Sequence, residues 1–196
     1  MSRVGIFGGT FNPPHSAHLR LLQFMRERYA LDTLYVVPCA LPPHKELAGD
    51  IPAEDRLKMA ELAFGEIAEV LDLEIRRGGR SYTVDTLREL SAPGRELFLF
   101  VGGDMILSFR QWRDYREILK LAKVRAFPRA GEEAEIDAEI ESLRQETNGD
   151  IERAELSALP LSSTAVREKL RSGESVRELI PESVLCYIER RGLYQK

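Results

Sequence analysis

The sequence predicts an α/β fold with a doubly wound, mainly parallel sheet, because short apolar runs alternate with helical patterns along its 196 residues. Alternation of this kind implies right-handed crossovers, with ligands bound at the carboxyl ends of the strands. Apolar runs of strand length cover 3–7, 33–38, 70–75, 96–101 and 123–127. Helical spacing covers 16–29, 53–64, which Pro52 opens, 84–90 and 115–121.

The first strand leads into a glycine turn and then a helix, through Gly8, Gly9 and Thr10 to His15 and His18. Two glycines allow the backbone to approach a ligand, and a helix N-terminus attracts anions. The histidines are spaced i, i+3, so both imidazoles project from one face of the first turn if the helix begins near Pro14. This stretch predicts a site that handles phosphate.

The middle of the chain carries a second feature at the end of a predicted strand. Gly102 and Asp104 directly follow the run 96–101, where a carboxylate can accept hydrogen bonds from ribose hydroxyls. Capping of the next turn, or an ordinary loop carboxylate, remains an alternative. The acid-rich segment 131–149 has apolar residues at i, i+4 and i+7, which predicts a surface helix, and 152–157 fits a last strand.

The third feature is a helix start that contains three hydroxyl residues, Ser162, Ser163 and Thr164, and then Arg167; its helix stops at Gly173. Hydroxyl side chains at this position satisfy free N–H groups at the helix start, and the same groups can bind an anion. Arg167 adds a fork-shaped cation. Simple capping is the more common role of such residues, so the residues alone leave both roles open.

Composition limits the class of protein. A net charge of −4 disfavours a broad nucleic-acid surface, and no apolar run approaches the roughly 20 residues of a membrane span. Cys39 and Cys186 match no disulfide or metal spacing, which favours a reducing cytoplasm, and no signal peptide is expected. We expect one domain over 1–196, with 160–196 as a helical C-terminal part. The glycine pattern of dinucleotide-binding dehydrogenases is absent.

Taken together, these motifs resemble the nucleotidyltransferases with an HxGH box, and more closely the bacterial nicotinate-nucleotide adenylyltransferases. Ala17 departs from the usual glycine of that box. The resemblance extends over nearly the whole chain and implies a Rossmann-like nucleotidyltransferase fold. Its landmarks here are residues 8–13, His15 with His18, 42–45, 56–59, 81–87, 102–105, 112–113, 161–167, 180–181 and 193–194.

The resemblance implies that the adenylyl group of ATP is transferred to nicotinate mononucleotide in NAD biosynthesis. His15 and His18 would be catalytic, donating to the triphosphate as charge develops. The residues that would bind ATP are Gly8, Gly9, Thr10, Phe11, Gly102, Asp104, Ser162, Ser163, Thr164 and Arg167. Those that would bind the acceptor nucleotide are Asn12, His44, Lys45, Tyr82, Thr83, Trp112 and Arg129, although a chain's only tryptophan is more often a core residue.

Two histidines at this spacing can also bind zinc, but a catalytic zinc site normally takes three protein ligands, and only His44 is left to join. We therefore expect no protein metal ligands, and Mg²⁺ bound mainly through the ATP phosphates. Another acceptor, such as nicotinamide mononucleotide or phosphopantetheine, remains an alternative, as does a nucleotide-binding module without turnover. We expect no nucleic-acid or membrane partner, and a homo-oligomer stays open.

Overall fold

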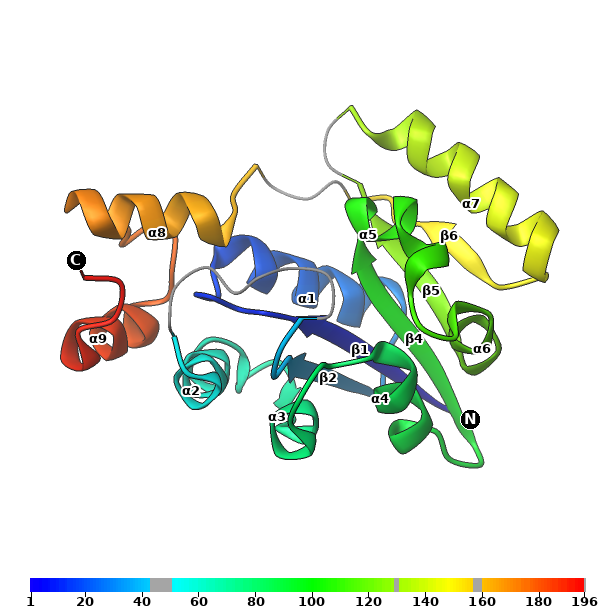
Figure 1. The fold of residues 1–196 in the computed structure, drawn as a ribbon, viewed down its shortest axis with the longest axis horizontal. Helices are drawn as coiled ribbons and strands as arrows, with labels where there is room; N and C mark the ends of the chain where they lie inside the picture. Colours follow the sequence, from blue (N-terminus) through cyan, green and yellow to red (C-terminus); the bar gives the residue numbers. More distant parts are fainter. Residues whose placement is uncertain (43–50, 129–130, 157–159, 196) are drawn as a thin grey trace. The chain divides into compact units, whose positions relative to one another are not determined.

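The chain, in a computed structural model, forms a six-stranded sheet with the order β3-β2-β1-β4-β5-β6 and flanking helices (Figure 1). The described residues are 1–42, 51–128, 131–156 and 160–195. They divide into two compact units, which are described separately below. Unit 1 comprises 1–8, 24–35 and 82–160, and unit 2 comprises 9–23, 36–81 and 161–196.

The strands pair in parallel, as the sequence predicts. Val4 lies opposite Leu97, Leu97 opposite Ala122, and Val124 opposite Ile151. The strand bounds are β1 Ser2–Gly9, β2 Thr33–Pro38, β3 Glu69–Val70, β4 Arg95–Gly102, β5 Ala122–Phe127 and β6 Ile151–Arg153.

Helices follow the predicted pattern, and two of them match their predicted bounds to the residue. The bounds are α1 Ser16–Arg28, α2 Ala53–Phe64, α3 Leu73–Arg77, α4 Thr83–Leu90, α5 Gly103–Leu107, the 3₁₀ helix η1 Phe109–Gln111, α6 Tyr115–Leu121, α7 Glu133–Thr147, α8 Ser163–Ser172 and α9 Glu182–Arg191. The predicted Rossmann-like fold class, with its helical C-terminal part, is confirmed.

The predicted strand at 70–75 is wrong. Only Glu69–Val70 is extended, and the chain turns into α3 at Leu73. Asp72 and Arg76 form an ion pair of 2.9 Å one turn apart, which helical spacing allows and a strand does not. The last strand is likewise shorter than 152–157, since β6 covers Ile151–Arg153 and residue 157 lies outside the described part.

The acid-rich segment forms α7, as expected. Ile136, Ile140 and Leu143 are the residues of α7 that are buried, so one narrow apolar stripe faces the protein. The helix is followed by Asn148, which adopts the left-handed conformation with φ 54°.

Unit 2 has its own apolar core, built from the C-terminal helices and α2. Val166 of α8, Val184 and Ile188 of α9 and Met59 of α2 share one buried cluster, and α9 lies beside α2 (Figure 1). The interpretation of 1–196 as a single domain stays a prediction. Among the described helices, none is both long and apolar enough to cross a membrane.

Unit 1 requires a glycine in the middle of β1. A Cβ atom on Gly5 would lie 2.5 Å from Cδ1 of Leu31 and 3.0 Å from the ring of Phe100. Both neighbours are packed core side chains, so little space can open without displacing one of them.

We expect Gly5→Ala to lower the free energy of unfolding by about 1–3 kcal/mol through overpacking, as measured by urea denaturation. Leu31→Ala removes the closest methyl group, so the double variant should be destabilised by less than the sum of the single variants. Strict additivity of the two changes would contradict this packing account.

Candidate functional site

The residues after β1 form a short loop that bends back on the strand. Phe11 has a positive φ of 48°, and its ring lies where a Cβ on Gly9 would be, 2.8 Å from ring atom Cζ. Gly9 is therefore required by the Phe11 ring. Because β1 continues through Gly9, the two glycines end the strand and do not form a turn, which corrects the expected strand end at residue 7.

The two predicted catalytic histidines lie together at the start of α1. Their rings stack with centroids 3.7 Å apart, and the backbone N–H of His15 donates to Nδ1 of His18 at 3.1 Å. Helix α1 begins at Ser16 and not near Pro14, so His18 is its third residue. The His18 side chain accepts the N–H of His15, the residue just before the helix. In a capping box, a glutamate at this third helical position makes the same bond.

This bond also determines which nitrogen of His18 carries the proton. Nδ1 is an acceptor, so the neutral ring has its hydrogen on Nε2. Burial lowers the pKa of His18 well below 6.5, and the neighbouring His15 lowers it further. Burial likewise lowers the pKa of His15 from 6.5 to about 4. Both imidazoles are thus neutral near pH 7.

Aromatic rings hold the pair in place. Phe11 meets the His18 ring edge-on with centroids 5.2 Å apart, and Phe64 of α2 packs edge-on against Phe11 at 5.3 Å. Phe11 is 2% exposed, so it lies beneath His18 in the interior. Its predicted contact with ATP stays a prediction.

Backbone donors at the start of α1 are less available than the sequence predicts. The N–H of His15 is bonded to His18, and the N–H of Ser16 donates to the Leu179 carbonyl at 2.8 Å. An anion at this point would be met mainly by imidazole hydrogens.

Arg56 of α2 is a residue whose role the sequence interpretation missed. It is fully buried, and its guanidinium donates to three carbonyl oxygens: those of Thr10 at 3.0 Å, Cys39 at 2.7 Å and Ala40 at 2.8 Å. It thereby ties the loop after β1 to the segment after β2. Arg56 lies on the same helical face as the buried Met59 and Phe64. This position could have indicated its role from the sequence, since arginine is almost never buried without partners.

The structure brings the second predicted motif onto the histidine loop. In the Ser162–Arg167 segment, Ser163 Oγ donates to the Pro13 carbonyl at 2.8 Å, and Arg167 Nη1 donates to the Asn12 carbonyl at 2.8 Å. Arg167 is 8% exposed, and burial lowers its pKa, although it remains a cation. Two motifs about 150 residues apart thus form one surface of unit 2.

The hydroxyl groups of this helix start have different roles. Ser162 caps α8, because its Oγ accepts the Ala165 N–H at 3.2 Å. The hydroxyl hydrogen of Ser163 is donated to the Pro13 carbonyl, so this side chain has no hydrogen left to donate to an anion. Thr164 Oγ1 accepts from Arg167 Nη2 at 3.0 Å, which leaves its hydrogen for an anion. Ser162 therefore has the capping role, and anion binding at this helix start stays a prediction.

In unit 1, Gly102 ends β4 and Asp104 lies in the first turn of α5. A Cβ on Gly102 would lie 2.7 Å from Oδ1 of Asp104, so the glycine gives the carboxylate its space. The N-cap position of α5 is occupied by Gly102 and not by Asp104. The predicted contact of Asp104 with ribose stays a prediction. The carboxyl end of the central strand β4 thus carries a partly exposed carboxylate, as predicted.

The predicted residues for the pyridine ring also lie in unit 1. Tyr82 and Thr83 open α4, and Trp112 follows η1, with its ring 5.1 Å from Phe109. Arg113 joins the two segments: its guanidinium lies 4.9 Å from the Tyr82 ring centroid, while Nη1 is 3.7 Å from Asp85 Oδ2. This contact was missed as well, and a basic residue beside the only tryptophan was the available signal.

Trp112 is partly exposed, and its buried Nε1 has no hydrogen-bond partner among the described residues. Three predicted site residues, His44, Lys45 and Arg129, lie outside the described part of the chain. Within the described part, no three His, Cys, Asp or Glu side chains are grouped to hold a metal ion.

Comparison with known proteins agrees with this geometry. The cytidylyltransferase-like family model matches residues 6–169. The chain is 38% identical to the "Probable nicotinate-nucleotide adenylyltransferase" of Desulfatibacillum aliphaticivorans, covering 98% of this chain and 99% of that protein. A protein of the same name from Shouchella clausii is 37% identical, with 99% and 97% covered. The chain belongs to the nicotinate-nucleotide adenylyltransferase family.

A solved structure supports the fold. Plasmodium falciparum nicotinic acid mononucleotide adenylyltransferase, complexed with NaAD, has a TM-score of 0.76 at 18% identity, over 99% of this chain and 98% of that one.

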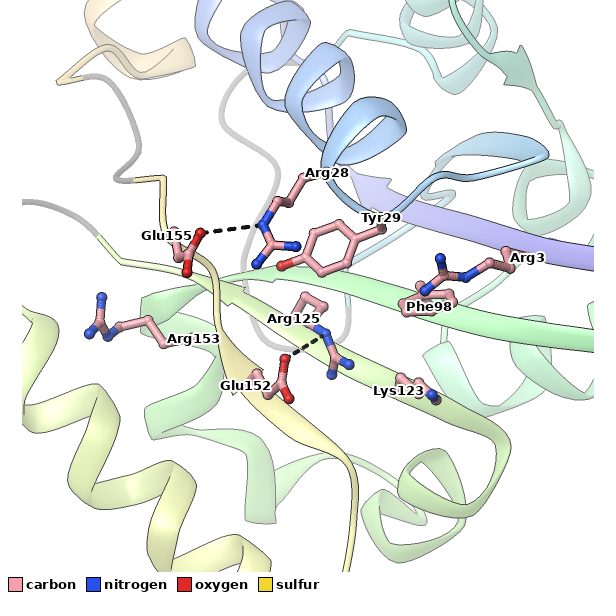
Figure 2. Close-up of a pocket in the computed structure, with 9 residues that line it drawn as sticks. All are labelled: Arg3, Arg28, Tyr29, Phe98, Lys123, Arg125, Glu152, Arg153 and Glu155. Atoms are coloured by element: carbon pink, nitrogen blue, oxygen red, sulfur yellow. Dashed lines mark hydrogen bonds and ion pairs between the residues drawn. The ribbon is translucent and has the colours of Figure 1, made fainter.

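A cavity of about 310 Å³ in unit 1 is a separate feature of this family member (Figure 2). It lies toward the amino ends of β1, β4 and β5, and none of the described site residues lines it. Each of its five cationic side chains is paired with a carboxylate, and we assign the cavity no ligand. The pairs are Arg3 and Lys123 with Glu96, Arg28 with Glu155, Arg125 with Asp150, and Arg153 with Asp137.

The histidine pKa values make a testable prediction about acid stability. His15 in the unfolded chain binds a proton below pH 6.5, whereas folded His15 does so only near pH 4, so stability falls as pH drops from 6.5 to 4. A shift of this size corresponds to about 3 kcal/mol. We expect NMR to place the His15 titration near pH 4. Urea denaturation of His15→Gln should show a shallower loss of stability over this range, and an equal loss would contradict the assignment.

Proposed function

We propose that this chain transfers the adenylyl group of ATP to nicotinate mononucleotide, forming nicotinate adenine dinucleotide and pyrophosphate. The observation that carries the proposal is the docking of the Ser162–Arg167 helix start onto the loop that bears His15 and leads to His18 of α1, in a chain of this family. Neutral donors and a buried cation on one surface suit a triphosphate whose negative charge increases on its leaving side.

The nucleophile is the 5′-phosphate of nicotinate mononucleotide. It is largely dianionic at pH 7, since the second pKa of a phosphate monoester is about 6, and it therefore needs no general base. It attacks the α-phosphorus of ATP; one P–O bond forms, and the bond to pyrophosphate breaks. The protein aligns the reactants and stabilises the charge that develops.

We assign the α-phosphate to the histidines. His18 presents Nε2–H, because its Nδ1 accepts the N–H of His15. His15 Nδ1 is buried without a partner among the described residues, so this ring is held by its stacking on His18. His18 donates to an α-phosphate oxygen, and His15 bonds an oxygen near the bridging position.

The helix start of α8 receives the β- and γ-phosphates through the Thr164 hydroxyl, the Arg167 guanidinium and nearby backbone N–H groups. Gly102 and Asp104 receive the ribose of ATP. Tyr82, Thr83 and Trp112 receive the pyridine ring, with Thr83 and the N–H groups that open α4 on its carboxylate. Asn12, with His44, Lys45 and Arg129, serves the acceptor nucleotide.

Mg²⁺ is proposed to bind mainly through the phosphates of ATP. No group of three candidate ligands occurs in the described residues, so phosphate oxygens and water would form its coordination shell, which suits this ion. Bound there, it would offset charge on the phosphates. Cytoplasmic location and a homo-oligomer stay predictions.

The decisive experiment for the reaction is incubation with ATP, Mg²⁺ and a panel of acceptors, with chromatographic detection of the dinucleotide. Product from nicotinate mononucleotide supports the proposal. Binding without product would indicate a nucleotide-binding module. Product formed only from phosphopantetheine would show that phosphopantetheine, and not nicotinate mononucleotide, is the acceptor.

We expect kcat/KM for nicotinate mononucleotide to exceed that for nicotinamide mononucleotide by a factor on the order of 10². The carboxylate of the acid accepts charge-assisted hydrogen bonds from Thr83 and helix N–H groups. The NH₂ group of the amide would face these same donors, and each donor left without an acceptor would cost about 1–3 kcal/mol. Measurement of both acceptors at fixed ATP tests this. Equal values would remove the acid preference and leave adenylyl transfer intact.

We expect His18→Gln to lower kcat by about 10²-fold or more with little change in KM for ATP, because the imidazole donor acts on developing charge. Glutamine retains an acceptor for the His15 N–H, so the helix start should stay formed. His18→Ala removes both functions and should also lower the melting temperature. Normal kcat in a folded His18→Gln variant would exclude the catalytic role.

A further inference from the structure

Asn12 lies in the loop before the histidines, and its side chain is fixed from the far end of the chain. The Tyr194 hydroxyl donates to Oδ1 of Asn12 at 2.6 Å, across 182 residues of sequence. Both residues are buried, with 3% of Asn12 and 7% of Tyr194 exposed. Both belong to unit 2.

Tyr194 is held in an unusual backbone conformation to make this bond. Its φ is +64°, a region that bulky residues rarely adopt and that is maintained only where surrounding structure enforces it. The enforcing structure is the end of α9: Gly192 donates to the Glu189 carbonyl, and Leu193 to the Ile188 carbonyl at 3.0 Å. This pattern is a Schellman motif, which directs the next residue back toward the protein.

The phenol is suited to a permanent donor role. Burial raises the pKa of Tyr194 well above its ordinary value, so the hydroxyl keeps its proton at any pH at which the protein is active. A donated hydrogen requires an acceptor, so the carboxamide of Asn12 presents its oxygen to Tyr194. Its NH₂ group then faces away from the Tyr194 hydroxyl.

We infer that Tyr194 is a positioning residue, which orients the Asn12 carboxamide so that its NH₂ group donates to the 5′-phosphate of the acceptor nucleotide. The inference rests on the proposed function, which places Asn12 with the acceptor. A reversed carboxamide would turn a carbonyl oxygen toward a phosphate and repel it. The bond from Tyr194 opposes that reversal by leaving a buried hydroxyl without an acceptor.

The chain provides a matched control in the same helical segment. Tyr187 of α9 donates its hydroxyl to Oδ1 of Asp55 at 2.7 Å, so Tyr187→Phe removes the same atom from the same region. Asp55 keeps a second partner in Arg191, whose Nε lies 3.2 Å away. Neither Tyr187 nor Asp55 belongs to the proposed substrate or catalytic groups.

The test compares Tyr194→Phe with Tyr187→Phe in steady-state kinetics and thermal denaturation. We expect Tyr194→Phe to lower kcat/KM for nicotinate mononucleotide by about 10- to 100-fold, since a misplaced positioning group costs a factor of this order. KM for ATP should change by less than about twofold, as expected for a group that binds only the acceptor. Tyr187→Phe should leave both parameters within about twofold of wild type.

A double variant tests whether Tyr194 acts through Asn12. Once Asn12→Ala has removed the carboxamide, adding Tyr194→Phe should produce no further loss in kcat/KM for the acceptor. Full additivity of the two losses would overturn the inference, as would equal effects of the two tyrosine variants, unchanged acceptor kinetics in Tyr194→Phe, or a loss confined to ATP. A wild-type chain that forms no dinucleotide would instead reject the proposed function itself.

Discussion

The loop between β1 and α1 depends on hydrogen bonds supplied by side chains from elsewhere. It carries His15 and leads into α1, which carries His18. Because the loop belongs to no helix or strand, its carbonyl groups need partners outside regular structure. Arg56 bonds the Thr10 carbonyl, Arg167 that of Asn12, and Ser163 that of Pro13. A buried carbonyl without such a partner would cost about 1–3 kcal/mol. These bonds explain why the C-terminal helices belong to the same unit as the loop.

This arrangement also determines the electrostatics of the surface. Arg167 bonds a carbonyl and a hydroxyl oxygen, and these neutral acceptors satisfy its hydrogens without cancelling its charge. Burial makes that charge more effective, because surrounding water no longer screens it. The residue that fixes the loop can therefore also attract an incoming phosphate. A carboxylate partner would have fixed the loop equally well and weakened that attraction.

Much of the fold could be predicted from periodicity. Helices 53–64 and 115–121 match to the residue, because strong apolar spacing and a preceding Pro52 or polar turn mark their ends. The strand expected at 70–75 fails because its apolar residues are too few to distinguish a strand from one helical turn, and the ion pair of Asp72 with Arg76 decides for the helix.

The site could be predicted in its residue types but not in its contacts. The motifs indicate the histidines and the Ser162–Arg167 helix start, yet no local pattern shows that the Ser163 hydroxyl donates to the Pro13 carbonyl. Nor does a local pattern show that Arg56 binds three carbonyls or that Tyr194 reaches Asn12, since these bonds span 16 to 182 residues. Such contacts follow from tertiary packing, which sequence spacing does not encode.

The neutral state of the histidines has a consequence for turnover. A cationic imidazole would attract ATP, the transition state and pyrophosphate alike, and uniform attraction of that kind does not raise kcat. A neutral Nε2–H of His18, oriented by the His15 N–H, binds an oxygen more strongly only as negative charge accumulates on it. In the proposed reaction, burial of the pair, which lowers both pKa values, would therefore favour the transition state over the product. The aromatic packing of Phe11 and Phe64 around the pair contributes to that burial, and in the proposed reaction it would thereby support selective stabilisation of the transition state.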